Sequence, residues 1–451
     1  MLPERGYIYT PVPTIMQHFE VEDATAMPWA INQTQELQPA DIGRSSTSAP
    51  LDMEAGSSAW DTAMVILGAV VGGGILTLPF AMRQAGWALL LLIVLVGGVM
   101  MFTYVVIGQV LEHVNPAAEA LKIDKQRRDW SIIGLVAFGQ TGQTFFGVVQ
   151  NVNLFGVLIS MTMLGGSCLH ALFPEVHRHI LISVMGCLST TVLFFDTGWI
   201  ATFAKLGNLA VAMVMICLLV TGVQLWLAGA EAEHKVVDVQ QVPFACGTLV
   251  MLFSAHGEAP FIYQQMQNPA EWTGASIMAS SMVGAFLVVS AIFGYAILGN
   301  AAESSFVVNL GKDLNLVALP GTWNMHLSRL TSGLMFLKLF LVQPVIAMPI
   351  VLSVKGWPES IKIGVSSAKL LLMLATTLFC IFFVHKLHLV IELVGSVIET
   401  AVSVILPCLT CLKLRGRHLS RTLQLTHIAL ILIFGIYAMV AGVLITMDLV
   451  S

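Results

Sequence analysis

The chain has 451 residues, of which 57% are hydrophobic and only 10% are charged, and its formal net charge at pH 7 is -5. An ordinary soluble domain carries about 25% charged residues, so this composition excludes a water-soluble globular protein. It also excludes nucleic acid as a partner, because neutralising phosphates takes a basic face and the Lys and Arg residues here are scattered. We therefore expect an integral membrane protein whose surroundings are a lipid bilayer.

Residues 1–59 differ in composition from the rest of the chain. They contain several prolines, a run of Ser and Thr, and eight acidic residues against two basic ones, Arg5 and Arg44. A segment this polar cannot bury enough apolar surface to fold. It also lacks the basic start and apolar run of a cleaved signal peptide. We predict a disordered tail over 1–59 and a transmembrane domain over 60–451.

The transmembrane domain is expected to be all-α. A helix needs about 20 apolar residues to cross a bilayer, and this rule predicts about eleven transmembrane helices. They are expected near residues 60–84, 86–111, 140–171, 179–195, 199–229, 243–265, 271–299, 326–354, 362–385, 387–412 and 423–447.

The loops between these helices predict an orientation. With the tail inside, the inner loops hold ten Lys and Arg residues and the outer loops hold five. Positive charge resists translocation, so the bias favours a cytosolic N-terminus. The sequon Asn32-Gln33-Thr34 would then stay unglycosylated. The short outer loops carry no sequon, which favours a vacuolar, lysosomal or vesicular membrane over the plasma membrane.

The first predicted helix is interrupted near its middle. Gly72, Gly73 and Gly74 follow one another, and Pro79 comes shortly after. Glycine weakens a helix, and proline withholds a backbone donor. Unwound backbone at this depth is tolerated only where it lines a cavity. The alternative is that Gly68 and Gly72 only let two helices pack closely, but three successive glycines exceed what packing needs.

A break of this kind has a chemical use. The freed N–H groups at the start of the second half-helix lie at its positive dipole end and suit a carboxylate. The freed carbonyls on the other side suit a cation or an ammonium group. The break therefore predicts a site for a zwitterion or an ion.

The sixth predicted helix has a second interruption, which reads Ser254-Ala255-His256-Gly257-Glu258 before Pro260. Ionisable groups at this depth are expensive and are functional candidates. This helix runs opposite to the first, and each opens a five-helix unit, over about 60–229 and 243–412, with an extra helix at about 423–447. Two broken helices in such positions indicate an inverted-repeat transporter.

A longer motif surrounds the first break and reads Gly68-Ala-Val-Val-Gly-Gly-Gly74-Ile-Leu-Thr-Leu-Pro79-Phe-Ala-Met-Arg-Gln-Ala85-Gly86. Shorter motifs are Ile262-Tyr-Gln-Gln-Met266-Gln-Asn-Pro269, Gly294-Tyr295-Ala-Ile-Leu-Gly299 with Glu303-Ser304, and Val394-Gly395-Ser396 with Leu406-Pro407. Together they resemble the amino acid/auxin permease family, in the branch that holds vesicular and vacuolar amino-acid transporters, over about residues 60–450.

The resemblance implies a LeuT-like fold with discontinuous first and sixth helices. It implies that the backbone from Val71 to Ile75, through Gly72, Gly73 and Gly74, holds the α-carboxylate of the substrate. The second break, with Ser254, Ala255, His256 and Gly257, would hold the rest. This second stretch is more charged here than the neutral stretch of many members, so the selectivity for the substrate's side chain does not carry over.

Two residues are candidates for coupling to an ion. In some proton-coupled relatives of this fold a lysine in the fifth helix takes the place of a sodium ion, and Lys205 lies early in that helix. A buried lysine could bind and release a proton; the alternative is that Lys205 reaches the inner interface. The second candidate is Glu258, whose alternative is to cap the second half-helix.

Three further ionisable residues bear on the coupling ion. Lys338, in the eighth helix, lies near the level where sodium-coupled relatives use hydroxyl residues, and its charge would oppose sodium. Glu392 and Glu399 share a face of the tenth helix, as a relay or, as we favour, in a wet vestibule.

These features predict a secondary active transporter of small neutral amino acids that works by alternating access, with a proton as the coupling ion. Alternatives are a sodium-coupled amino-acid symporter and a membrane sensor that binds an amino acid without moving it. No catalytic residues, cofactor or metal are expected, because no nucleophile lies beside a base and no ligand set has metal spacing.

Overall fold

The computed structural model describes residues 56–241, 249–303, 305–317, 319, 322–354, 363–384, 394–436 and 439–440. The predicted tail lies outside these ranges except for residues 56–59, and so does Glu392. The predicted boundary between tail and transmembrane domain therefore stays a prediction.

Regular structure in the described residues is helical. The helices are, in chain order, α2 (Ala59–Val70), α3 (Leu78–Ala85), α4 (Leu89–Ala120), α5 (Trp130–Leu172), α6 (Arg178–Val192), α7 (Ile200–Leu227), α9 (Ala259–Gln264), α10 (Trp272–Leu298), α11 (Thr322–Ser353), α12 (Val365–Phe382), α14 (Leu406–Arg415) and α15 (Arg421–Ala429). Two π-helical segments, Val394–Glu399 and Ala401–Ile405, lead into α14, and a third, Leu430–Ile436, continues α15.

The predicted all-helical, multi-span architecture is confirmed. Within the described residues, seven helices and the bent pair of α2 and α3 are long and apolar enough to cross a membrane. The fourth predicted span corresponds to α6, whose 15 residues reach only about 22 Å, short of the roughly 30 Å of hydrocarbon. The sixth is interrupted, and the eleventh is described only as far as Ile436 as a short apolar helix.

The third predicted span begins earlier than expected, at Trp130 and not near 140. Asp129 caps the helix, because its carboxylate accepts hydrogen bonds from the N–H groups of Ser131 (2.9 Å) and Ile132 (3.4 Å). Gly139 then kinks α5 with φ +72°, a left-handed conformation that glycine adopts without steric cost. The apolar pattern marked only the part beyond this kink.

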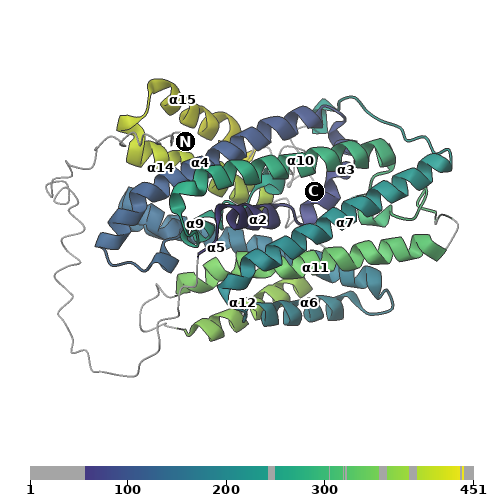
Figure 1. Ribbon diagram of the computed structural model, residues 1–451, viewed down its shortest axis with the longest axis horizontal. Helices are drawn as coiled ribbons and strands as arrows, with labels where there is room; N and C mark the ends of the chain where they lie inside the picture. The colour runs from purple at the N-terminus through teal and green to yellow at the C-terminus, as the bar shows by residue number, and fades with distance from the viewer. Residues whose placement is uncertain are drawn as a thin grey trace, which may run out of the picture. The chain divides into compact units, whose positions relative to one another are not determined.

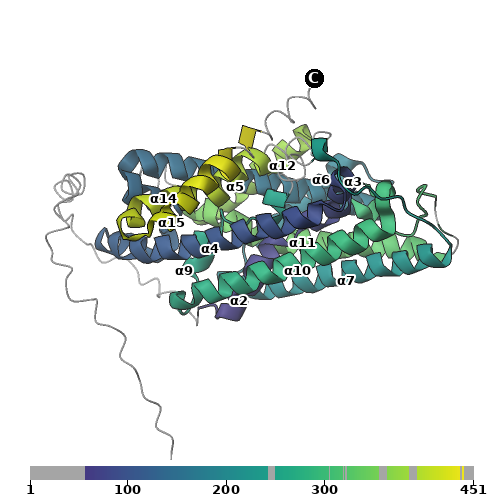
Figure 2. The same cartoon turned by 90° about the horizontal axis from the view of Figure 1, so that it is seen from above.

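Helix α2 lies in the middle of the packing. It contacts α7, α9, α10 and α11, and Figure 1 shows it between α10 and α11. Every residue from Thr62 to Val70 is buried, as expected for a helix that is apolar all round. Figure 2 shows α14 and α15 beside α4, which α14 also contacts, away from α2.

The chain that leads into α2 is tied to the chain that leaves α9. The N–H of Ser57 donates to the carbonyl of Gln265 at 2.9 Å, and the N–H of Gln267 donates to the carbonyl of Ser57 at 3.0 Å. These two hydrogen bonds link the start of the first broken helix to the end of the second.

Close packing of α4 against α10 depends on Gly108. Trp272 of α10 donates from Nε1 to the carbonyl of Tyr104 at 2.8 Å, across the face where Gly108 lies. A Cβ at Gly108 would lie 2.7 Å from that Nε1. Gly98, on the same helix, is exposed, and no atom of the described residues lies within 4 Å of a Cβ built there.

We expect Gly108→Ala to lower the thermal stability of the purified protein in detergent, because overpacking of this kind costs about 1–3 kcal/mol. Gly98→Ala is the matched control and should leave stability unchanged or raise it by about 0.5–1 kcal/mol. Recovery of the monodisperse peak in size-exclusion chromatography after heating measures both. Equal losses in the two variants would contradict the packing of α4 against α10.

Candidate functional site

The first break separates α2 from α3. Helix α2 ends at Val70, a short 3-10 helix spans Gly73–Thr77, and α3 begins at Leu78. The two half-helices meet at 48°. Pro79 lies in the first turn of α3, where its missing N–H costs nothing, so it starts the second half-helix. The glycines thus account for the break, and the proline for where the helix resumes.

Backbone donors are available at this break. The first N–H groups of a 3-10 helix have no partner within the helix. The N–H of Ile75 turns back to the carbonyl of Gly72 at 3.4 Å, which leaves the N–H groups of Gly73 and Gly74 without an intrahelical acceptor. Val71 and Ile75 on either side are buried. Two neighbouring N–H groups beside a helix start suit a carboxylate.

The second break has the same construction. Residues 249–253 are helical, Ser254 and Ala255 are not, and α9 begins at Ala259 with Pro260 in its first turn. Ala255, His256 and Glu258 are buried. Each predicted residue of the second break therefore lies in non-helical backbone inside the helix bundle.

The two breaks adjoin each other. Gly74 packs so closely against the side chain of Leu252 that a Cβ at Gly74 would overlap it, and α2 contacts α9. Gly72 faces Met161 of α5. The structure thus brings the glycine run and the second break together, as the sequence predicted for one site.

Three long side chains hold the backbone of the second break. Trp130 Nε1 donates to the carbonyl of His256 at 2.9 Å, and Gln150 Nε2 donates to the carbonyl of Gly257 at 3.1 Å. The N–H of Ala255 donates to the hydroxyl of Tyr104 at 2.7 Å. These contacts satisfy backbone groups that would otherwise be orphaned away from water.

The side chain of His256 belongs to a hydrogen-bonded chain. Its ring stacks on Tyr104 with centroids 3.8 Å apart. Nε2 lies 2.9 Å from Thr103 Oγ1, and Nδ1 lies 3.0 Å from Ser254 Oγ. Ser254 Oγ is also hydrogen-bonded to Glu399 Oε1. Glu399, expected in a wet vestibule, is instead buried at 3% exposure.

Glu258 occupies the N-cap position of α9. Its carboxylate accepts no hydrogen bond from the first N–H groups of that helix. Glu258 therefore does not cap the second half-helix with its side chain, which was the alternative to a proton-binding role. The carboxylate is 4% exposed and interacts electrostatically with Glu399. Two acidic side chains therefore lie close together inside the bundle.

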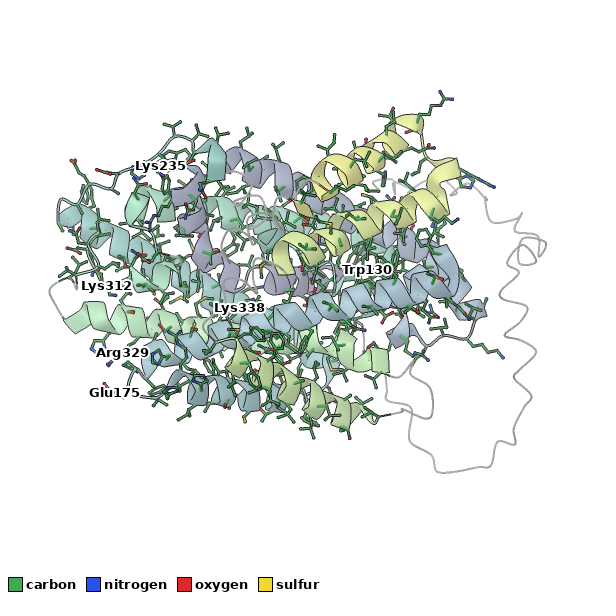
Figure 3. All side chains as sticks on the ribbon, turned by 180° about the vertical axis from the view of Figure 1, so that it is seen from behind. Trp130, Glu175, Lys235, Lys312, Arg329 and Lys338 are labelled. Carbon is green, nitrogen blue, oxygen red and sulfur yellow. The ribbon has the colours of Figure 1, made fainter. Side chains whose placement is uncertain are left out.

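The two lysines differ in burial, and Lys205 follows the alternative in which it reaches the helix-bundle surface. The Lys205 side chain is 46% exposed and pairs with Asp61 at 2.5 Å, so the buried ammonium assumed for Lys205 does not exist in this structure. Lys338 is only 1% exposed and donates to the carbonyl of Gly68 at 2.5 Å and to Asn208 Oδ1 at 3.4 Å. Figure 3 shows Lys338 near the middle of the bundle.

Several buried polar atoms near the breaks have no hydrogen-bond partner among the described residues. Asn153 lacks a partner for both amide atoms, and a Cβ at Gly257 would lie 2.9 Å from its Nδ2. Further atoms of this kind on α2, α5, α9 and α11 are Thr62 Oγ1, Gln150 Oε1, Gln264 Oε1, and Gln343 Nε2 and Oε1. An unsatisfied buried group costs about 1–3 kcal/mol, and a polar ligand or water between the breaks would satisfy it.

Sequence reasoning missed Thr103, Tyr104 and Trp130 as parts of this site. They lie on α4 and at the start of α5, far from both breaks in the chain. The available signal was a Thr-Tyr pair and a Trp inside apolar stretches, which also suits ordinary packing. Among the described residues, no group of three His, Cys, Asp or Glu side chains could hold a metal ion.

The chain resembles known proteins over most of its length. Residues 55–448 match the sequence profile of a family described as "Transmembrane amino acid transporter protein". "Amino acid transporter AVT1D" of Arabidopsis thaliana is 25% identical over 385 residues, which are 82% of this chain and 66% of that protein. The chain thus spans about two thirds of the length of this relative.

Two further likenesses concern a mammalian relative and a solved structure. "Putative sodium-coupled neutral amino acid transporter 11" of Bos taurus is 23% identical over 272 residues, 56% of each chain. The crystal structure of MhsT in complex with L-phenylalanine matches with a TM-score of 0.55 at 13% identity, over 87% of this chain and 97% of that chain. This match shows the fold, and the predicted LeuT-like fold is confirmed.

We expect Trp130→Phe to lower thermal stability by about 1–3 kcal/mol, because the buried carbonyl of His256 loses its side-chain donor while the aromatic packing is kept. Trp226→Phe is the control, since Trp226 is 76% exposed. Size-exclusion chromatography after heating compares the two. If Trp130→Phe were as stable as Trp226→Phe, Trp130 would not hold the break.

Proposed function

The chain belongs to the transmembrane amino acid transporter family, and on that basis we propose that it is a secondary active transporter of a small neutral amino acid. Membership confirms the resemblance to the amino acid/auxin permeases, and also that the chain is no enzyme, because the family is one of transporters. One observation carries the proposal: two adjoining helix breaks are bordered by buried amides without partners.

The substrate's carboxylate binds to the first break in this proposal. The N–H groups of Gly73 and Gly74 lie at the start of a helix segment, where the dipole favours negative charge. The backbone from Val71 to Ile75 frames them. The geometry supports a small anionic group that approaches the main chain closely, which a side chain at these positions would prevent.

The rest of the substrate binds to the second break. Ser254, Ala255, His256 and Gly257 lie in non-helical backbone against α4 and α5. Asn153 places its amide beside Gly257 and near Glu399. Asn153 and Leu154 pack closely against Gly257, which supports a small substrate side chain.

A proton is the coupling ion that the site supports best. Lys338 directs its ammonium to the carbonyl of Gly68 at the end of α2, the kind of group that would otherwise coordinate a cation. A fixed ammonium there opposes sodium. Glu258, the proton-binding candidate from the sequence, interacts with a second buried carboxyl group, Glu399, and in this proposal the proton binds at this pair of carboxyl groups. Lys338 is buried, whereas Lys205 is half-exposed. Sodium is the alternative, and the printed name of the bovine relative favours it.

The proposal also states on which side of the membrane the N-terminus lies and in which type of membrane the protein resides. The excess of Lys and Arg in alternate loops supports a cytosolic N-terminus. The absence of sequons from the short outer loops supports a vacuolar, lysosomal or vesicular membrane. Glycan on Asn32 in cells would contradict this sidedness.

Uptake into proteoliposomes tests the proposed function. The purified full chain is reconstituted and offered an equimolar mixture of the twenty labelled amino acids, with a pH gradient and a sodium gradient imposed separately. We expect a small neutral amino acid to accumulate under the pH gradient. Accumulation under sodium alone would refute proton coupling. Binding without uptake under either gradient would make the chain a sensor.

Gly73→Val should leave the protein inserted and abolish uptake, because the branched side chain blocks the approach of a carboxylate to the backbone. Gly284→Val is the matched control, since no atom of the described residues lies within 4 Å of a Cβ there. Both variants are compared by uptake per amount of reconstituted protein. Normal uptake by Gly73→Val would remove the substrate site from the first break.

Lys338→Met should abolish accumulation under the pH gradient, because it leaves the carbonyl of Gly68 and Asn208 Oδ1 without a buried ammonium. Lys205→Met removes the same charge from a half-exposed position and should retain most of the accumulation. The opposite ranking in the same uptake assay would return the coupling role to Lys205.

A further inference from the structure

Four side chains from three parts of the bundle form one line of hydrogen bonds. Thr103 comes from α4, Ser254 and His256 from the second break, and Glu399 from the π-helical segment before α14. All but Ser254 are fully buried. π-helical turns are frequent at functional sites, and the number of protons in this line can be counted from its contacts.

The count begins at Thr103. Its hydroxyl has one hydrogen, which is donated to a backbone carbonyl of the preceding turn, Met100 at 3.0 Å or Val99 at 3.2 Å. Thr103 Oγ1 can then only accept a hydrogen bond from His256 Nε2 at 2.9 Å. In this arrangement the Nε2 atom of His256 carries the proton of the neutral ring.

The count continues at Ser254, whose hydroxyl also has one hydrogen. It lies 3.0 Å from His256 Nδ1 and is hydrogen-bonded to Glu399 Oε1. With Nε2 protonated, a neutral His256 offers only an acceptor at Nδ1, and a carboxylate offers only acceptors. One serine hydrogen cannot serve both neighbours, so with His256 protonated at Nε2 both contacts are made only when the line holds one further proton. Without that proton, both contacts require His256 to carry its proton on Nδ1, and Nε2 then needs the hydrogen that Thr103 donates to the backbone.

That proton has two positions, and both satisfy every contact. In one, Glu399 is a neutral carboxylic acid that donates to Ser254 Oγ, and Ser254 donates to Nδ1 of neutral His256. In the other, the serine proton has moved to Nδ1 and the proton of Glu399 has moved to Ser254. Glu399 is then a carboxylate and His256 an imidazolium, so charge and protons balance.

Resting on the proposed function, we propose that Glu399, Ser254 and His256 form the site that binds the proton driving transport, one proton being shared between the carboxyl and the imidazole. Loss of this proton either leaves an acceptor facing an acceptor at Ser254 or moves the ring proton to Nδ1 and turns the Thr103 hydroxyl from the carbonyl of Met100 to Nε2. Ser254 and His256 are themselves part of the second break. Proton release therefore changes the backbone that lies beside the substrate.

Among the ionisable groups inside the bundle, Glu258 favours the protonated state of the site formed by Glu399, Ser254 and His256. Glu258, on the same break, interacts electrostatically with Glu399, and two buried carboxylates repel when both are charged. From α4, Tyr104 stacks on His256. From α5, the Asn153 amide interacts with Glu399 and opposes this effect, because a donor stabilises the carboxylate. On α15, His427 contacts Phe102 and the carbonyl of Leu423. The buried cation Lys338 is bound to Gly68 and Asn208.

Counterflow separates coupling from substrate binding. Proteoliposomes loaded with the equimolar mixture of unlabelled amino acids exchange it for the labelled mixture without a pH gradient. Glu399→Gln should keep this exchange and lose accumulation under a pH gradient. Glu271→Gln, an exposed glutamate at the start of α10, is the charge-matched control and should keep both. Accumulation by Glu399→Gln driven by the pH gradient as in the wild type would overturn the proposal.

Infrared difference spectroscopy tests the site without any substrate. A pH titration of the purified full chain should show the C=O stretch of a protonated carboxyl that disappears in Glu399→Gln and stays in Glu258→Gln. Ser254→Ala should move this band to higher frequency, because the acid loses its hydrogen-bond partner, and Ser254→Thr should restore it. A titration identical in wild type and Glu399→Gln would overturn the proposal. If the wild-type protein showed this band but no counterflow of amino acids, the proposed transport function would be contradicted and the proton site would stand.

Discussion

The structure depends on one constraint, which is that a backbone polar group inside a membrane must find a partner. A continuous helix meets it internally, and this chain interrupts two helices that contact each other. The protein meets the constraint at the second break with side chains, as Trp130, Gln150 and Tyr104 bind its backbone. At the first break Lys338 takes one carbonyl, and the N–H groups of Gly73 and Gly74 have no acceptor within the helix. In the proposed function these two groups bind the substrate's carboxylate.

The buried ionisable side chains Lys338 and Glu399 also have hydrogen-bond partners inside the bundle. Lys338 is bound by oxygens at the end of α2 and on α7. Glu399 is bound through Ser254 to His256, and Glu258 lies close enough to influence it. A positive group thus lies beside the first break and negative groups beside the second. A zwitterion with its carboxylate at the first break and its ammonium toward the second fits this polarity.

Much of the fold could be predicted because its causes are local in the sequence. Long apolar runs marked the spans, and Gly72 to Gly74 and the stretch from Ser254 to Pro260 marked the breaks. The start of α5 could not be predicted from the apolar pattern. The helix is capped by Asp129 and kinked at Gly139, so its first turns do not read as part of the apolar span. Burial was the other failure: Lys205 and Lys338 both lie in apolar stretches, and only packing decides which one faces Asp61 and which faces Gly68. Glu399 was misjudged for the same reason.

Hydrogen–deuterium exchange at the first break tests the central claim most directly. The purified chain is exchanged with and without the equimolar amino-acid mixture, and the peptide that contains Gly73 and Gly74 is compared with the one that contains Gly98. If these N–H groups bind the substrate's carboxylate, the first peptide gains protection when amino acids are present and the second does not. Amino-acid binding without protection of the first peptide would contradict a substrate site at the break.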